Sequence, residues 1–64
     1  MTFGEKVKIV REKTDLSQEK LAVQLGVSFS TVNRWEKGHV MPSYLAQEKF
    51  EQFCISKKIT FDNK

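Results

Sequence analysis

The sequence predicts an all-α fold, a compact bundle of four to five helices that contains a helix-turn-helix. Apolar residues recur at helical spacing in four segments. Hydroxyl residues stand just before several of these segments, and glycines follow two of them. A chain of 64 residues forms one small domain, which we place over residues 1–57. Residues 58–64 are then a C-terminal tail or the start of a further segment.

The first helix is expected from about residue 3 to residue 13. Its apolar positions lie at i, i+4 and i+7 and form one face, made of Phe3, Val7 and Val10. Thr2 and Glu5 have the S/T-x-x-E spacing of a capping box, which predicts a helix start at this point. Asp15 follows the helix, and aspartate tolerates the left-handed backbone of a helix end better than most residues.

The segment from Gln18 to Lys37 reads as two short helices joined by a tight turn. The inward positions are apolar in both helices: Leu21, Ala22 and Leu25 in the first, Val32 and Trp35 in the second. Gly26 permits the backbone shape that a tight turn needs. Ser17 and Ser28 are placed to cap the two helices, and Gly38 follows the second one. This is the pattern of a helix-turn-helix.

The segment and its flanks strongly resemble the helix-turn-helix of the phage repressor/Cro (Xre-like, or Cro/C1-type) family. The matching positions are Gln18, Leu21-Ala22, Leu25-Gly26-Val27, Val32 and Trp35-Glu36-Lys37-Gly38, with Leu16-Ser17-Gln18 and Pro42-Ser43 around them. The resemblance covers residues 3 to 55 or so. It implies a repressor-like transcriptional regulator that binds double-stranded DNA and reads the major groove with the second helix of the motif.

Four residues of that second helix are the candidate base readers: Phe29, Ser30, Arg34 and, in reserve, Asn33. With Val32 and Trp35 facing inward, these residues lie on or beside the outward face, and the family's matching positions 29, 30 and 34 face base edges. Arg34 suits guanine, and Phe29 suits a thymine methyl group. The alternatives are a solubilising charge for Arg34, and for Phe29 an apolar contact with the preceding helix or with a neighbouring chain.

A second group of residues is expected to contact phosphate and fix the register on DNA: Gln18, Ser28, Thr31, Lys37, His39, Ser43 and Tyr44. The family also pairs an arginine at the position of Arg11 with the glutamate at Glu36. The alternative is an Arg11 that is simply solvated among other helix charges. An ion pair would tie the first helix to the end of the recognition helix.

The last helix is expected from about residue 43 to residue 57. Its apolar stripe is Leu45, Ala46, Phe50, Phe53 and Cys54. Cys54 reads as a small core residue and not as a nucleophile, because no acid–base partner is evident. In the tail, Ile59 and Phe61 have three interpretations. They fold back on the last helix, pair with a second chain, or mark a continuation into a longer protein.

The composition of the chain excludes several classes of protein and site. The net charge of +3 suits a polyanionic partner. One cysteine cannot form an internal disulfide, and we find neither a membrane-spanning stretch nor a signal peptide. His39 is the only histidine, without zinc ligands at suitable spacing. We therefore expect a cytoplasmic protein with no catalytic residues, no cofactor and no metal. One short recognition helix touches only a few base pairs, so we also expect a homodimer, at least on DNA. The alternatives are an antitoxin-like or other protein-interaction module, or the DNA-targeting domain of a larger protein.

Overall fold

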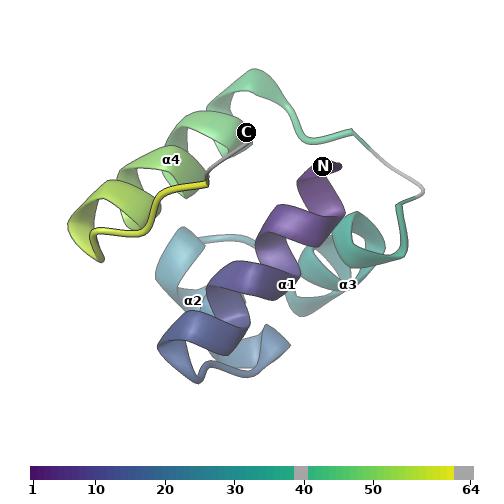
Figure 1. Cartoon of the computed structure of the whole chain (residues 1–64). Coiled ribbons are helices and arrows are strands. Elements are labelled where there is room, and N and C mark those ends of the chain that lie inside the picture. The colour runs from purple at the N-terminus through teal and green to yellow at the C-terminus, as the bar shows by residue number, and fades with distance from the viewer. Residues whose placement is uncertain (39–40, 62–64) are drawn as a thin grey trace.

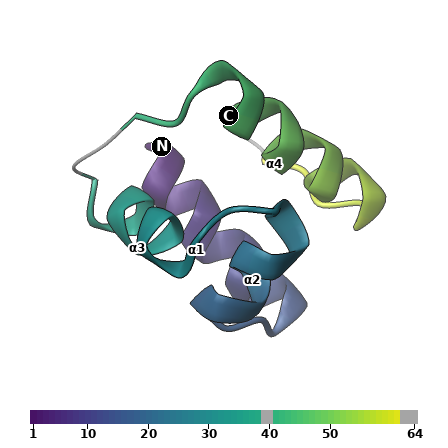
Figure 2. The same cartoon turned by 180° about the vertical axis from the view of Figure 1, so that it is seen from behind.

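The computed structural model describes residues 1–38 and 41–61, and four helices account for most of that part. They are α1 (Phe3–Thr14), α2 (Gln18–Leu25), α3 (Phe29–Lys37) and α4 (Tyr44–Ser56). Figures 1 and 2 show α1, α2 and α3 grouped together, with α4 along one side of the group. The described residues contain no strand, which confirms the all-α prediction. No helix among them is both long and apolar enough to cross a membrane.

Each helix begins at a hydroxyl side chain that accepts a hydrogen bond from a backbone N–H in the first turn. Thr2 and Glu5 form the full capping box, in which each side chain accepts from the backbone N–H of the other. Ser17, Ser28 and Ser43 cap the other three helices. Such a cap is worth about 1 kcal/mol, so the starts of these short helices are set locally by sequence.

The first three helices end at residues with left-handed backbone. Asp15 has φ of 57°, and Gly26 and Gly38 have φ of 70° and 79°. A left-handed residue ends a helix because it turns the chain away from the helix axis while its N–H still bonds the last turn. At Gly26 this geometry fixes the tight turn between α2 and α3, where the N–H of Val27 donates to the carbonyl of Ala22 at 3.0 Å.

The core is formed by one side of every helix. Its buried members are Val7, Val10, Leu21, Ala22, Leu25, Val32, Trp35, Phe50, Phe53 and Cys54. Phe3 of α1 contacts two further helices. Its ring packs edge-on against Trp35 of α3, with the ring centroids 5.1 Å apart, and against Phe50 of α4, with the centroids 4.9 Å apart. The backbone of Gly4 lies so close to the carbonyl of Trp35 that an added Cβ would overlap the oxygen. The first turn of α1 is therefore packed directly on the end of α3.

Leu45 does not lie in the core, contrary to the sequence prediction. The side chain is 59 % exposed. Phe50 lies five positions further along the helix, which is a net rotation of about 140° around the helix axis. A helix that buries Phe50, Phe53 and Cys54 therefore turns Leu45 outward. The helix is also one residue shorter at each end than expected, because Ser43 and Lys57 are its caps.

The described part of the tail folds back on the protein. Lys58 has a positive φ of 59°, and the N–H of Ile59 donates to the carbonyl of Cys54 at 2.9 Å, which reverses the chain after α4. Ile59 and Phe61 then pack against the core, with the Phe61 ring 6.4 Å from that of Phe50. Of the three interpretations of Ile59 and Phe61, the structure therefore shows the one in which the tail folds back on the last helix.

Candidate nucleic-acid interface

Helix α3 has one buried side and one side open to solvent. Val32 is fully buried and Trp35 is 3 % exposed, and these two residues fix the rotation of the helix. The open side carries Ser30, Arg34 and Lys37, all exposed. A helix held by its buried side presents these side chains as a rigid row, which is the form in which a helix enters the major groove.

Three further polar residues of this element lie at the edge of the open side. The hydroxyls of Ser28 and Thr31 are 2.8 Å apart, and the Ser28 hydroxyl also accepts the Thr31 N–H at 3.1 Å. These two side chains therefore organise the start of α3 first of all. Asn33 is half-buried beside the exposed row. Phe29 is 47 % exposed and is not among the residues packed on the core.

One carboxylate connects the end of α3 to two other helices. Glu36 Oε2 accepts from Arg11 Nε at 2.6 Å, and Glu36 Oε1 accepts from Arg11 Nη2 at 3.0 Å. Glu36 Oε1 also accepts from the amide of Gln18 at 3.0 Å. The guanidinium completes its contacts with the carbonyl of Leu16 at 3.3 Å. The Glu36 side chain is only 5 % exposed and Arg11 is 28 % exposed. A nearly buried carboxylate and a partly buried guanidinium thus connect α1, α2 and α3.

The environment of Glu36 acts on its pKa in two opposite ways. Burial raises the pKa, because it penalises the charged carboxylate. The hydrogen bonds from Arg11 and Gln18, together with the positive charge of Arg11, lower it and prevail. The pKa of Glu36 is therefore below its ordinary value, and the hydrogen bond to Glu36 in turn raises the pKa of Arg11. Both groups are charged near neutral pH.

The contact between Gln18 and Glu36 is the feature that sequence reasoning missed. The sequence predicts that Gln18 positions the protein on DNA, and it is the first residue of α2, where free N–H groups point outward. The structure adds that one N–H of its side chain is already used inside the protein. Gln18 and Glu36 are 18 residues apart, so no local spacing signals the pair. The one hint in the sequence was the arginine–glutamate pair that the family resemblance implies, because a buried carboxylate needs further hydrogen-bond donors.

The other predicted positioning residues lie at the start of α4. The Ser43 hydroxyl accepts from the N–H of Ala46 at 3.2 Å, and Tyr44 is 79 % exposed. The N-terminus of a helix favours negative charge, which suits a phosphate near these residues.

His39 lies outside the described residues. Cys54 is buried, and burial raises the pKa of its thiol, which makes it a poor nucleophile.

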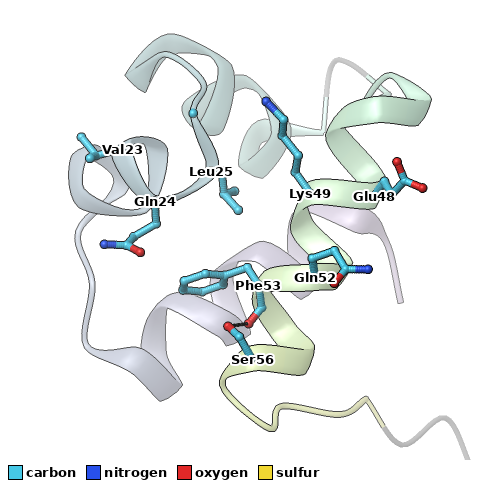
Figure 3. A pocket seen from close by; sticks show the side chains of 9 residues that line it. Val23, Gln24, Leu25, Glu48, Lys49, Gln52, Phe53 and Ser56 are labelled. Carbon is cyan, nitrogen blue, oxygen red and sulfur yellow. Dashed lines mark hydrogen bonds between the residues drawn. The ribbon is translucent and has the colours of Figure 1, made fainter.

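A shallow groove of about 790 Å³ lies between α2 and α4 (Figure 3). Its walls are Val23, Gln24, Leu25, Gly26, Glu48, Lys49, Gln52, Phe53 and Ser56. No residue of α3 contributes to it, so the groove is separate from the exposed row. It therefore adds nothing to the candidate interface.

Comparison with known proteins defines the class. A sequence profile of the helix-turn-helix family matches residues 7–52. The chain belongs to this family, in its Xre-like form, and its helix-turn-helix is a DNA-binding element of the kind found in transcriptional regulators.

The comparison with curated proteins includes the HTH-type transcriptional activator BcrR of Enterococcus faecalis, to which the chain is 38 % identical over 64 residues. The match covers 97 % of this chain and 29 % of that protein, so the chain spans less than a third of its relative. No solved structure matches the chain.

Proposed function

We propose that the protein regulates transcription by binding a specific sequence in double-stranded DNA, with α3 in the major groove. The observation that carries the proposal is the exposed row on α3. Ser30, Arg34 and Lys37 face solvent from a helix whose other side is buried and whose end is tied by Glu36 to α1 and α2. A rigid helix with donors on one face satisfies the requirement of base recognition for fixed geometry.

The base readers in this proposal are Arg34, Ser30 and Phe29, with Asn33 in reserve. The guanidinium of Arg34 offers a planar pair of donors that matches guanine O6 and N7. Ser30 can donate or accept and so tolerates several bases. Phe29 has no polar group, and its exposed ring suits a thymine methyl group. Asn33, half-buried beside the row, suits adenine.

Phosphate contacts fix the position of the helix in the groove. We assign this role to residues in and around α3: Gln18 on α2, Ser28, Thr31 and Lys37 toward the two ends of α3, and Ser43 and Tyr44 at the start of α4. Gln18 retains its amide oxygen and one amide N–H for this purpose after its bond to Glu36. These contacts supply affinity without sequence choice. His39 completes the set as a prediction from sequence alone.

The wider role follows from DNA binding. We infer a cytoplasmic protein that is not an enzyme and needs neither metal nor cofactor, with a DNA-binding domain over residues 1–57. One short helix reads only a few base pairs, so useful specificity calls for two copies about one helical turn apart. The bound form is then a homodimer.

Selection of bound duplexes from a random library tests the proposal. The wild type should enrich one sequence motif, arranged as an inverted repeat. Arg34→Ala should weaken binding to that duplex by about 1–3 kcal/mol and flatten the preference at one guanine per half-site. Arg34→Lys should retain much of the affinity and lose the preference. Lys13→Ala is the matched control, since it removes one positive charge from α1 and should keep the selected motif.

Two results would count against the assignment. If Arg34→Ala weakens every duplex equally and selects the wild-type motif, Arg34 contacts phosphate. If the wild type binds no duplex at low salt, the chain is a protein-interaction module instead. An exposed apolar patch of Phe29, Ile59 and Phe61 would support that alternative, but Ile59 and Phe61 pack on the core without Phe29. The other alternative is the DNA-targeting domain of a larger protein. The match to only 29 % of BcrR agrees with it, and it predicts the same result of the selection.

A further inference from the structure

Phe29 is the one candidate base reader without a polar group in its side chain. It is the first residue of α3, and the N-terminal residues of a recognition helix are those that contact base edges. Its side chain is 47 % exposed and is not among the residues packed on the core. Val32 and Trp35 hold the helix that carries it, and both are buried. The ring is therefore presented from a fixed position, with apolar surface available for a contact.

The apolar group that a base pair presents in the major groove is the C5 methyl group of thymine. The modified base 5-methylcytosine carries the same methyl group at the same place on its ring. The two pyrimidines differ at the neighbouring carbon, where thymine has an oxygen that accepts and cytosine has an amino group that donates. A phenyl ring forms an apolar contact with the methyl group in either case. Phe29 therefore suits a methylated pyrimidine and does not separate thymine from 5-methylcytosine.

The rest of α3 does not supply a side chain that makes this distinction by charge. A carboxylate is the usual acceptor for the amino group of cytosine. Glu36 is the one acidic residue of α3, and it is 5 % exposed and bonded to Arg11 and Gln18. Asn33 follows Phe29 by four residues, which makes the two neighbours on the helix surface. Its amide can donate to the thymine oxygen or accept from the cytosine amino group.

We propose that α3 reads the methyl group itself, so that methylation of a cytosine in the binding site strengthens binding of the protein. An unmethylated cytosine offers Phe29 no methyl group, and α3 has no exposed carboxylate for its amino group. Methylation at C5 adds the apolar group that the ring can contact. Cytosine methylation would thus regulate the occupancy of such a site. The inference rests on the proposed function, because it requires α3 to lie in the major groove.

The size of the effect follows from the burial of one methyl group, which corresponds to about a fourfold change in affinity. Two half-sites with the same contact give about sixteenfold, if the two contacts are independent. Specific and non-specific binding to DNA differ by roughly a thousandfold or more. Methylation therefore adjusts the occupancy of a site that the other contacts already define, and does not create a site by itself.

Base replacement in the duplex selected from a random library tests the inference with the wild-type protein. Each thymine of a half-site is replaced in turn by uracil, which removes only the methyl group. At one position this should weaken binding by about fourfold per half-site. A 5-methylcytosine·guanine pair at that position should bind about as well as thymine·adenine. A cytosine·guanine pair there should bind no better than uracil·adenine.

A pair of variants tests whether Phe29 is the residue that reads the methyl group. Phe29→Ser should bind the thymine and uracil duplexes equally, because the ring is gone. Val23→Ser is the matched control, since it makes the same kind of change at an apolar side chain of α2 that is 78 % exposed. It should retain the fourfold ratio. Thermal unfolding of both variants checks that they fold, and if Phe29→Ser does not, the duplex series with the wild type decides.

Failure of the inference and failure of the proposed function give different results. If the wild type selects a duplex but no uracil weakens binding, DNA binding stands and methyl reading is overturned. The same holds if Phe29→Ser keeps the ratio of the wild type. If 5-methylcytosine binds no better than cytosine, the site reads the paired adenine, for which Asn33 is suited, and the effect of methylation is overturned. If the wild type selects no duplex, the proposed function and the inference both fall.

Discussion

The carboxylate of Glu36 accepts three hydrogen bonds, two from Arg11 and one from Gln18, while it is almost fully buried. Removing one charge of a buried pair leaves the other charge without a partner, which costs about 3–5 kcal/mol. We expect Arg11→Met and Glu36→Gln each to lower the free energy of unfolding by about 3 kcal/mol, the lower end of that range, since Arg11 is 28 % exposed.

The double variant should lose clearly less than the sum of the two single losses, because neither charge is then stranded. Urea unfolding of the four proteins measures the difference. Glu12→Ala, an exposed residue of the same helix, serves as the control and should change the free energy of unfolding by less than about 0.5 kcal/mol. Strictly additive losses would mean that the pair contributes no coupling to the fold.

The lowered pKa of Glu36 also predicts how stability depends on pH. Because this pKa is lower in the folded protein than in the unfolded chain, the folded state binds fewer protons at this site. The resulting stabilisation is complete above the unfolded pKa of about 4.3 and is lost as the pH falls through the folded pKa. Unfolding measured from about pH 7 to about pH 3 should show a steeper loss of stability in the wild type than in Glu36→Gln. Parallel curves would contradict the assignment.

At the scale of the elements, the sequence predicts the starts and ends of helices best, because the residues that determine them are neighbours in the chain. Caps such as Ser17 and Ser28 lie next to the helices they start, and the left-handed end at Asp15 follows from the residue itself. The exposed position of Leu45 does not follow from periodicity, because periodicity alone does not say which of two overlapping apolar stripes a helix buries. The pair Gln18–Glu36 depends on how α2 and α3 cross, and that angle is set only when the whole core packs.

The contribution of the tail to the free energy of unfolding can be measured directly. Phe61 is half-buried, stacks on Phe50 and lies under the ammonium of Lys6 at 5.5 Å. Full removal of a core phenylalanine costs about 3–5 kcal/mol, so a half-buried ring should contribute less. We expect Phe61→Ala to lower the free energy of unfolding by about 1–2 kcal/mol. Ile55→Ala, at an exposed position of α4, should be nearly neutral. Equal effects would mean that the tail does not pack on the core in solution.

At the scale of the whole molecule, the excess of three positive charges is small, so the placement of each charge decides what it does. Lys37 lies at the end of α3, exposed and one residue after the buried Glu36. In the proposed complex it contacts a phosphate and releases one counterion on binding. Its removal should therefore reduce the slope of log affinity against log salt by about one unit per protomer.

Lys37→Ala should also weaken binding to all duplexes by about the same factor, because a phosphate carries no sequence information. Titrations of the selected duplex and of a scrambled duplex at several salt concentrations measure both effects together. Lys13→Ala, on α1, should leave the salt slope unchanged. A loss confined to the selected duplex, with the slope retained, would instead make Lys37 a base reader in addition to Phe29, Ser30 and Arg34. The base-contacting surface would then extend to the C-terminal end of α3.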